Sequence, residues 1–300
     1  MAEGLRRKED SLTALEFTRG GIDVPVAGGL VDLQPGRRHW PFTLEKWYAD
    51  VLLPDGTVIL VYLVQLRALG FSRALVTAEL FRPGYPAIRG DAPAPRVEGG
   101  EGWLDLGAAR IDGEVLSFET PGLAGRLKYS ARYPPAALGA PFVAQRQRTL
   151  EWTVEVPDAD VEGEVAWPGG RLPIRGRGYR DRVWLDVLPW GMPLRELAWG
   201  RIAAGPHATT WTVARLAGGG VRSVAWADGR IIQAEERPGT LGESRVLVES
   251  AVADLPGLNL GALRPVLRRL ALDPREVKWA CPATIGGHAG VAIHERVRWS

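Results

Sequence analysis

The chain has 300 residues, of which 46% are hydrophobic and 24% charged, and its 37 basic and 35 acidic residues leave a formal charge of +2. This composition is typical of a globular protein large enough for two domains, and the scattered charges indicate neither a nucleic-acid surface nor an anionic-membrane surface. A single cysteine, Cys281, excludes an internal disulfide framework and a multi-cysteine metal site, and it fits a reducing compartment.

The first residues, MAEGLRRKEDSLTALEF, mix acidic and basic side chains and lack the apolar stretch of a secretory signal. We expect residues 1–20 to form a loose arm or a short helix. The most apolar run, Val58 to Val64, is far shorter than the roughly 20 residues needed to cross a bilayer. The sequence therefore predicts a cytoplasmic protein without a transmembrane segment.

Alternation of apolar and polar residues predicts β-strands along most of the chain. Asp-Gly pairs at 55–56, 112–113 and 228–229 lie between apolar runs and predict tight hairpin turns. In LEWTVEV, the residues expected on one face are Leu150, Trp152, Val154 and Val156.

Two segments depart from this strand pattern. The apolar spacing over residues 263–270 predicts a short helix. Residues 133–145 are rich in proline, alanine and glycine, which indicates an irregular connection.

An internal repeat suggests the domain organisation. EKWYADVLLPDGTVILVYLVQL aligns without gaps on LAWGRIAAGPHATTWTVARLAG, matching Trp47 with Trp199. Each copy predicts a strand, a tight turn and a return strand, and the strand pattern breaks at 185–194. The sequence therefore predicts two all-β domains, 1–188 and 189–300, each closed into a barrel or sandwich.

Two of these stretches resemble a known family. EKWYADVLLPDG is similar to the first strand of the AttH and carotenoid 1,2-hydratase-like (CrtC-like) double lipocalin proteins, and GRGYRDRVW is similar to their Gly-x-Gly-Tyr-x-Asp-His-Asn-Trp signature. The resemblance covers roughly residues 40–300. It implies two lipocalin-like (calycin) β-barrel domains packed together, with few short helices. The family includes carotenoid hydratases and is similar to fungal cyclases that guide Diels-Alder reactions.

The signature also suggests site residues. The positions that match it are Gly176, Gly178, Tyr179, Asp181 and Trp184. The resemblance implies that Asp181 is the proton donor. Arg182 and Val183 stand where the signature has histidine and asparagine, and arginine cannot relay a proton as histidine does. Cyclising chemistry therefore fits better than water addition, because holding a near-attack conformer needs no proton relay.

Strand alternation puts Tyr179 and Asp181 on one face, and Arg180 and Arg182 on the other. In a barrel interior, desolvation would raise the pKa of Asp181 and let it donate a proton to an alkene or carbonyl, with Tyr179 orienting the substrate. Two alternatives stay open. The carboxylate could pair with an arginine at the domain junction, or it could orient a ligand without transferring a proton.

Twelve tryptophans either fill the core or line a ligand cavity. The candidates for cavity walls are Trp47, Trp184, Trp190, Trp199 and Trp211. Glu295 shares a predicted strand face with Ile293 and Val297. It is either a second carboxylate in the cavity or half of a cross-strand salt bridge.

Other chemistry has little support in the sequence. The four histidines never fall at metal-binding spacing, so we expect no metal site and no cofactor. No Gly-x-Ser-x-Gly motif indicates a hydrolase. The glycines of GRGYRD and the three at 218–220 are expected to form turns.

The leading hypothesis is a protein that binds a large hydrophobic molecule, such as an isoprenoid or a polyketide-derived compound. As an enzyme it would be a cofactor-free cyclase, isomerase or hydratase, with Asp181 as the acid. The alternatives are a non-catalytic carrier of hydrophobic metabolites and a purely structural or interaction module. The sequence indicates no oligomeric state.

Overall fold

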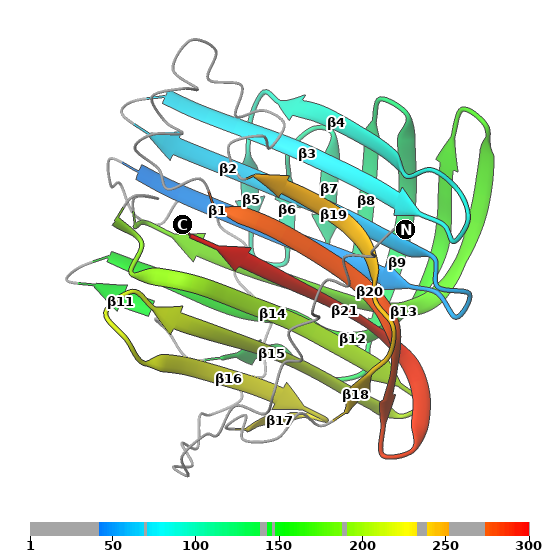
Figure 1. Cartoon of the computed structure of the whole chain (residues 1–300). Helices are drawn as coiled ribbons and strands as arrows, with labels where there is room; N and C mark the ends of the chain where they lie inside the picture. The colour runs from blue at the N-terminus through cyan, green and yellow to red at the C-terminus, as the bar shows by residue number, and fades with distance from the viewer. Residues whose placement is uncertain are drawn as a thin grey trace, which may run out of the picture.

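The computed structural model describes residues 42–68, 71–138, 143–145, 148–187, 191–232, 239–251 and 274–299. These residues form strands and turns, and none of them lies in an α-helix. Two sheets, each curled into a half-barrel, make up the fold (Figure 1). The prediction of an all-β protein is confirmed, whereas the helix expected at 263–270 lies outside the described residues.

The first sheet has the strand order β4-β3-β2-β1-β13-β12-β9-β8-β7-β6-β5, and β10 and β11 also pair with β12. The sheet curls far enough for β3 and β4 to contact β8 and β9. Its strands are β1 (Phe42–Leu52), β2 (Val58–Ala68), β3 (Phe71–Phe81), β4 (Ile88–Ala94), β5 (Glu98–Gly100), β6 (Trp103–Asp105), β7 (Ala109–Asp112), β8 (Val115–Thr120), β9 (Leu123–Ala131), β10 (Ala136–Ala137), β11 (Val143–Gln145), β12 (Arg148–Trp167) and β13 (Gly170–Leu185).

The second sheet has the order β17-β16-β15-β14-β21-β20-β18, with β19 also paired to β20. Its strands are β14 (Leu194–Ala204), β15 (His207–Leu216), β16 (Val221–Ala227), β17 (Arg230–Ile232), β18 (Thr240–Leu241), β19 (Arg245–Ala251), β20 (Arg275–Ile285) and β21 (His288–Arg298). Along the sequence, the last strand of the first sheet ends at Leu185 and the first strand of the second sheet begins at Leu194. Because residues 188–190 lie outside the described part, a domain boundary at 188/189 stays a prediction.

The two sheets repeat one arrangement around a central hairpin. Hairpin β1–β2 occupies the place in the first sheet that β14–β15 occupies in the second, and β13 and β21 correspond in the same way. The matched tryptophans are not equivalent, however. Trp47 lies in the core inside the first half-barrel, whereas Trp199 packs in the layer between the sheets.

The predicted hairpin turns are confirmed. Gly56, Gly113 and Gly229 each follow an aspartate and have φ values of 81°, 56° and 89°, in the region that glycine adopts readily. They join β1 to β2, β7 to β8, and β16 to β17. Within the range 133–145, Ala136–Ala137 and Val143–Gln145 pair with β12 as β10 and β11, so these described residues are less irregular than expected.

A β-bulge in β12 corrects one expectation about strand faces. Val154 is the partner of Asp181 and Val156 is the partner of Arg180, so β12 has one residue more than β13 at this point. Trp152 and Val154 consequently face the second sheet, whereas Val156 faces the inside of the first half-barrel. The four residues of LEWTVEV do not share one face, because the bulge interrupts the alternation.

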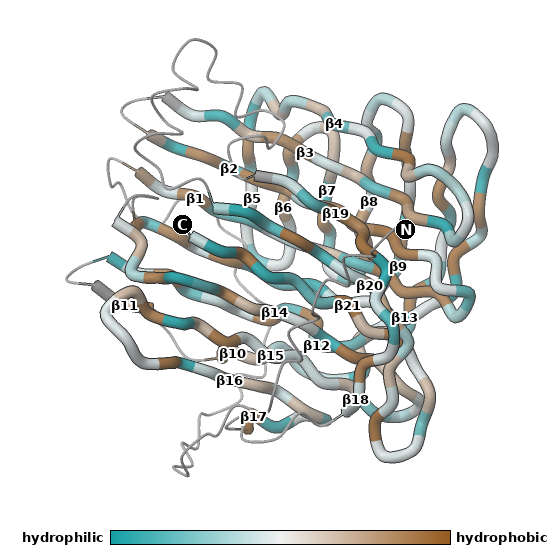
Figure 2. The backbone as a smooth tube through the Cα atoms, in the orientation of Figure 1, coloured by the Kyte–Doolittle hydropathy of each residue, from teal (hydrophilic) through white to brown (hydrophobic). Residues whose placement is uncertain are grey.

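Apolar residues are buried both inside the half-barrels and between the sheets. Figure 2 shows apolar and polar segments alternating along the long strands, as expected when each strand has two different faces. We call the layer between the sheets the inter-sheet core. Its buried members are Tyr48, Leu52, Val58, Leu60, Phe81, Ala136, Leu138, Trp152, Val154, Tyr179, Ala208, Trp226, Ala280 and Ile293.

Candidate functional site

The side chains of GRGYRDRVW alternate between two environments. Tyr179 lies in the inter-sheet core. The guanidinium of Arg180 lies 5.4 Å from the ring centre of Tyr129, inside the first half-barrel, and Arg182 lies on the same side. Asp181 therefore faces the second sheet, with the two neighbouring arginines on the other side of the strand.

Neither arginine is the partner of Asp181. Arg182 forms a salt bridge with Glu45 of β1, and Arg180 donates a hydrogen bond to the carbonyl oxygen of Gly113 at 3.0 Å. The reading of Asp181 as half of an Arg-Asp salt bridge is therefore wrong, because the alternation of β13 separates the charges.

Asp181 is held instead by two neutral donors. The hydroxyl of Tyr179 and the indole N–H of Trp152 each donate to its Oδ2 atom at 2.9 Å. Its Oδ1 atom has no hydrogen-bond partner in the described part of the chain, although the residue is only 4% exposed. A buried acceptor without a partner is costly. The Oδ1 atom therefore keeps an unused acceptor position.

Burial also changes the acidity of this carboxyl group. Desolvation raises the pKa of Asp181 to about 6, although the ammonium group of Lys46 and the two hydrogen bonds act in the opposite direction. With this pKa, a fraction on the order of one in ten is protonated at pH 7. The group can therefore donate or accept a proton near neutral pH.

The two signature glycines in β13 are not turn residues, contrary to expectation, and close packing explains them. A Cβ atom on Gly176 would lie 2.5 Å from the backbone oxygen of Leu52, and one on Gly178 would lie 2.6 Å from the ring of Tyr129. The glycines at 218–220 do form the turn between β15 and β16, as predicted.

The opposite wall of the site contains a buried lysine. The Nζ atom of Lys278 on β20 donates to the Tyr62 hydroxyl at 2.7 Å and forms a 2.8 Å ion pair with Glu295. It also lies 4.6 Å from the ring centre of Tyr48 and 5.8 Å from that of Trp199. Lys278 is 1% exposed, so its charge lies in an aromatic environment inside the protein.

Two acidic side chains adjust the charge around this lysine. Burial alone would lower the pKa of Lys278, but Glu295, Tyr62 and Glu276 together outweigh burial, and the pKa is raised well above its ordinary value. Burial would raise the pKa of Glu295, but Lys278 and Lys46 together hold it below its ordinary value. Glu276 lies 3.8 Å from the same ammonium group, and burial together with the charge of Glu295 raises its pKa to about 7.

A second buried ion pair joins the sheets beside the site. Arg201 of β14 donates through two nitrogens to the carboxylate of Asp50 on β1, with the Nε to Oδ2 distance at 3.1 Å. Tyr48 donates to the same carboxylate at 3.0 Å. Because Arg201 is 1% exposed and the Asp50 side chain 0% exposed, this pair fixes the position of one sheet on the other.

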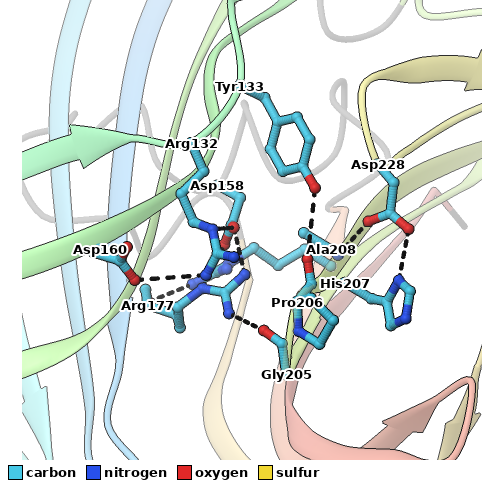
Figure 3. A network of polar contacts seen from close by, with 11 residues as sticks. Arg132, Tyr133, Asp158, Asp160, Arg177, Gly205, Pro206, His207, Ala208 and Asp228 are labelled. Atoms are coloured by element: carbon cyan, nitrogen blue, oxygen red, sulfur yellow. Dashed lines mark hydrogen bonds and ion pairs between the residues drawn. The ribbon is translucent and has the colours of Figure 1, made fainter.

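A further polar network connects the sheets at the ends of these strands (Figure 3). Arg177 forms a salt bridge with Asp158 and donates to the carbonyl oxygen of Gly205 at 2.6 Å. Tyr133 donates to the carbonyl oxygen of Pro206 at 3.5 Å. These contacts fix the turn between β14 and β15 against the first sheet.

The residues predicted from the sequence fall into three groups. Asp181, Tyr179, Trp199 and Glu295 lie in the same buried layer between the sheets. The others do not face this layer: Trp47 and Trp184 lie on the other face of the first sheet, and Trp211 packs with Ile202 and Cys281 on the other face of the second. Trp190 lies outside the described residues.

Four residues of the site were missed by sequence reasoning, namely Trp152, Tyr48, Tyr62 and Lys278. Alternation predicted that Trp152 is buried, but only the pairing of β12 with β13 brings it to Asp181. Tyr48 and Tyr62 are register partners on β1 and β2. A lysine between apolar residues of a strand, as in EVKWAC, is a signal that could have identified Lys278.

No group of three or more His, Cys, Asp or Glu side chains in the described ranges is placed to hold a metal ion. Among the residues that the structure describes, no helix has the length and apolar character of a membrane span.

Comparisons with known proteins identify the fold. No protein-family model matches the chain, and no curated protein matches its sequence. Among solved structures, an AttH-type protein from Nitrosomonas europaea aligns with a TM-score of 0.60 and 14% identity, over 92% of this chain and 100% of that one. Kievitone hydratase from Nectria haematococca aligns with a TM-score of 0.55 and 13% identity, over 95% of this chain and 96% of that one. The chain therefore has the fold of the AttH and CrtC-like double lipocalin proteins, as the sequence motifs predicted.

Proposed function

We propose that the protein is an enzyme that binds a hydrophobic small molecule between its two sheets and adds or moves a proton on it. The reaction is a hydration or an isomerisation, and Asp181 is the acid. A cyclisation started by the same proton transfer falls within this proposal.

The observation that carries the proposal is the state of the Asp181 carboxyl group. One oxygen is held by Tyr179 and Trp152, and the other is buried without a partner. A pKa of about 6 matches the requirement that a general acid titrates near the working pH. A purely structural aspartate would be expected to have both oxygens bonded.

The likeness to kievitone hydratase supports the same class of chemistry. Its name describes the addition of water to a small molecule, and both chains share the double lipocalin fold. In this chain, Tyr179 would keep the acid oriented and the aromatic rings of Tyr48 and Trp199 would contact the substrate.

The test begins with the molecule that the protein carries. Protein purified from its own host is extracted with organic solvent, and the released compound is identified by mass spectrometry. The compound is then incubated with the protein in deuterated water, because hydration and isomerisation both place a solvent hydron on carbon.

We expect Asp181→Asn to retain the compound but to incorporate deuterium at least about 100-fold more slowly. The matched control is Asp160→Asn, since Asp160 is 65% exposed on β12. Binding without deuterium incorporation by the unmodified protein would instead identify a carrier. A protein that is purified empty, and that binds none of a panel of terpenoids, polyketides and prenylated phenols, would refute ligand binding.

A further inference from the structure

The aromatic rings between the sheets already surround a positive charge. The Lys278 ammonium group lies 4.6 Å from the ring centre of Tyr48, 4.9 Å from that of Tyr62 and 5.8 Å from that of Trp199. A substrate carbocation placed against these rings would be repelled by the ammonium group. The site therefore disfavours the protonation of an isolated alkene, in which positive charge develops on carbon.

The same arrangement favours negative charge on a substrate oxygen. Tyr62 accepts a hydrogen bond from Lys278 at 2.7 Å, and no described residue accepts the hydrogen of the Tyr62 hydroxyl in return. A hydroxyl group that accepts from an ammonium group is a stronger donor, because the two hydrogen bonds polarise each other. A tyrosine hydroxyl directed at a developing oxyanion is an established way to stabilise one.

The local charge is compatible with this role. Two ammonium groups, Lys278 and the partly buried Lys46, lie within 6.0 Å of the Tyr62 ring centre. Glu295 supplies one negative charge, and Glu276 is partly protonated at neutral pH, because burial and Glu295 raise its pKa to about 7. Glu79 is the third carboxyl group that acts on Tyr62, and burial raises its pKa as well. Burial raises the pKa of Tyr62 well above its ordinary value, so its hydroxyl remains a donor.

The strand register gives the distance that a substrate would span. Tyr62 is the register partner of Tyr48, and Tyr48 is the register partner of Asp181, so the three lie in one row across β2, β1 and β13. Two strand spacings separate the backbones of Tyr62 and Asp181 by about 10 Å. An oxygen at Tyr62 and a reacting carbon at Asp181 fit a conjugated skeleton of one or two rings.

We propose that the substrate carries a conjugated carbonyl or phenol oxygen, which binds to the Tyr62 hydroxyl and the Lys278 ammonium group while the carbon that exchanges a proton lies at Asp181. This inference rests on the proposed function and names the substrate class. In an isomerisation, ionised Asp181 takes a proton from carbon, and the electron pair of that C–H bond moves through the conjugated system to the oxygen. Asp181 exchanges this proton with solvent and then delivers a hydron to another carbon while the electron pair returns from the oxygen, so no oxidant or reductant is needed.

Three probes that share a para-nitrophenyl group test the inference on the intact protein: para-nitrophenol, para-nitroanisole and para-nitrophenyltrimethylammonium. The first can become an anion, the second stays neutral, and the third is a cation. At a pH below the pKa of free para-nitrophenol, we expect the protein to bind it as the coloured phenolate. Binding should be at least about tenfold tighter than for the ether, a ratio that corresponds to one pKa unit, and the cation should bind most weakly.

Removal of the Lys278 charge should abolish the ionisation of the probe. The double variant Lys278→Met with Glu295→Gln removes both charges together and leaves no unpaired buried carboxylate. We expect its bound probe to be at least about tenfold less ionised. The matched control is Lys128→Met with Glu114→Gln, since that 3.8 Å pair is 62% and 58% exposed, and it should ionise the probe as the unmodified protein does.

Several results would overturn the inference. They are tighter binding of the cation than of the phenol, no binding of any probe, or full ionisation of the phenol by a folded Lys278→Met/Glu295→Gln variant. If that variant does not fold, as judged by circular dichroism, the comparison of the three probes on the unmodified protein still decides. Asp181→Asn should still bind the phenolate, so loss of deuterium incorporation in that variant tests the acid separately.

Discussion

Replacement of Asp181 with asparagine should make the protein more stable at neutral pH, and the gain should depend on pH. Asparagine keeps an oxygen that can accept from Tyr179 and Trp152, but it cannot ionise. The aspartate has a pKa of about 6 in the folded protein, against an ordinary value of 3.8, because it is buried. The folded state therefore holds the proton more tightly than the unfolded state.

The direction and the size of the change in stability follow from the difference between the folded and unfolded pKa values of Asp181. Well below pH 3.8 the carboxyl group is protonated in both states, so ionisation makes no difference to the free energy of unfolding. As the pH rises from about 4 to about 6, the unfolded state ionises first and the unmodified protein loses stability. A difference of roughly two pKa units corresponds to about 3 kcal/mol, and the loss is complete above pH 6.

Urea unfolding of both proteins at pH 4 and pH 7.5 measures the effect. We expect the free energy of unfolding of Asp181→Asn, relative to the unmodified protein, to increase by about 2.4 kcal/mol between the two pH values, because the unfolded state is already more than half ionised at pH 4. Asp160→Asn, at a position that is 65% exposed, should differ by less than about 0.5 kcal/mol at either pH. If the relative stability of Asp181→Asn were the same at both pH values, the claim of a desolvated carboxyl group would be wrong.

Two further substitutions test the contacts that position the site. Arg201→Met leaves the fully buried carboxylate of Asp50 without its cation, so it should cost about 3 to 5 kcal/mol in urea unfolding. The double variant with Asp50→Asn should recover most of that loss, and a double variant as unstable as the single one would contradict this explanation. Gly178→Ala would place a Cβ atom 2.6 Å from the Tyr129 ring and should cost about 1 to 3 kcal/mol. Gly218→Ala, with no atom within 4 Å of the new Cβ, should lower the melting temperature far less, and equal losses would argue against close packing at β13.

The strands and hairpins were predictable because their signals are local. Asp-Gly between two apolar runs requires only a positive φ at the glycine, and Gly56, Gly113 and Gly229 all have one. The all-β class and the arrangement of two similar sheets were predicted from such local patterns and from the resemblance of two motifs to the AttH and CrtC-like family. The bulge at Val154 and Val156 was not predictable, because an extra residue in β12 is defined only by its pairing with β13.

The site was predicted in part for the same reason. Alternation along β13 correctly separates Asp181 from Arg180 and Arg182, since it is a property of one strand. The identity of its donor Trp152 depends on register, and Lys278 depends on how the second sheet packs against the first. Contacts between segments more than a hundred residues apart leave no pattern in a single sequence.

The shared strand order of the two sheets has a consequence for how such a site can arise. β1 and β14 occupy corresponding places, yet Asp50 on the first faces Arg201 on the second. Two identical halves related by a two-fold axis would form each contact twice, once in each direction. Joining the halves in one chain frees each copy to change alone. The acid therefore lies on one wall and the lysine on the other, whereas a symmetric pair of halves would carry both groups on both walls.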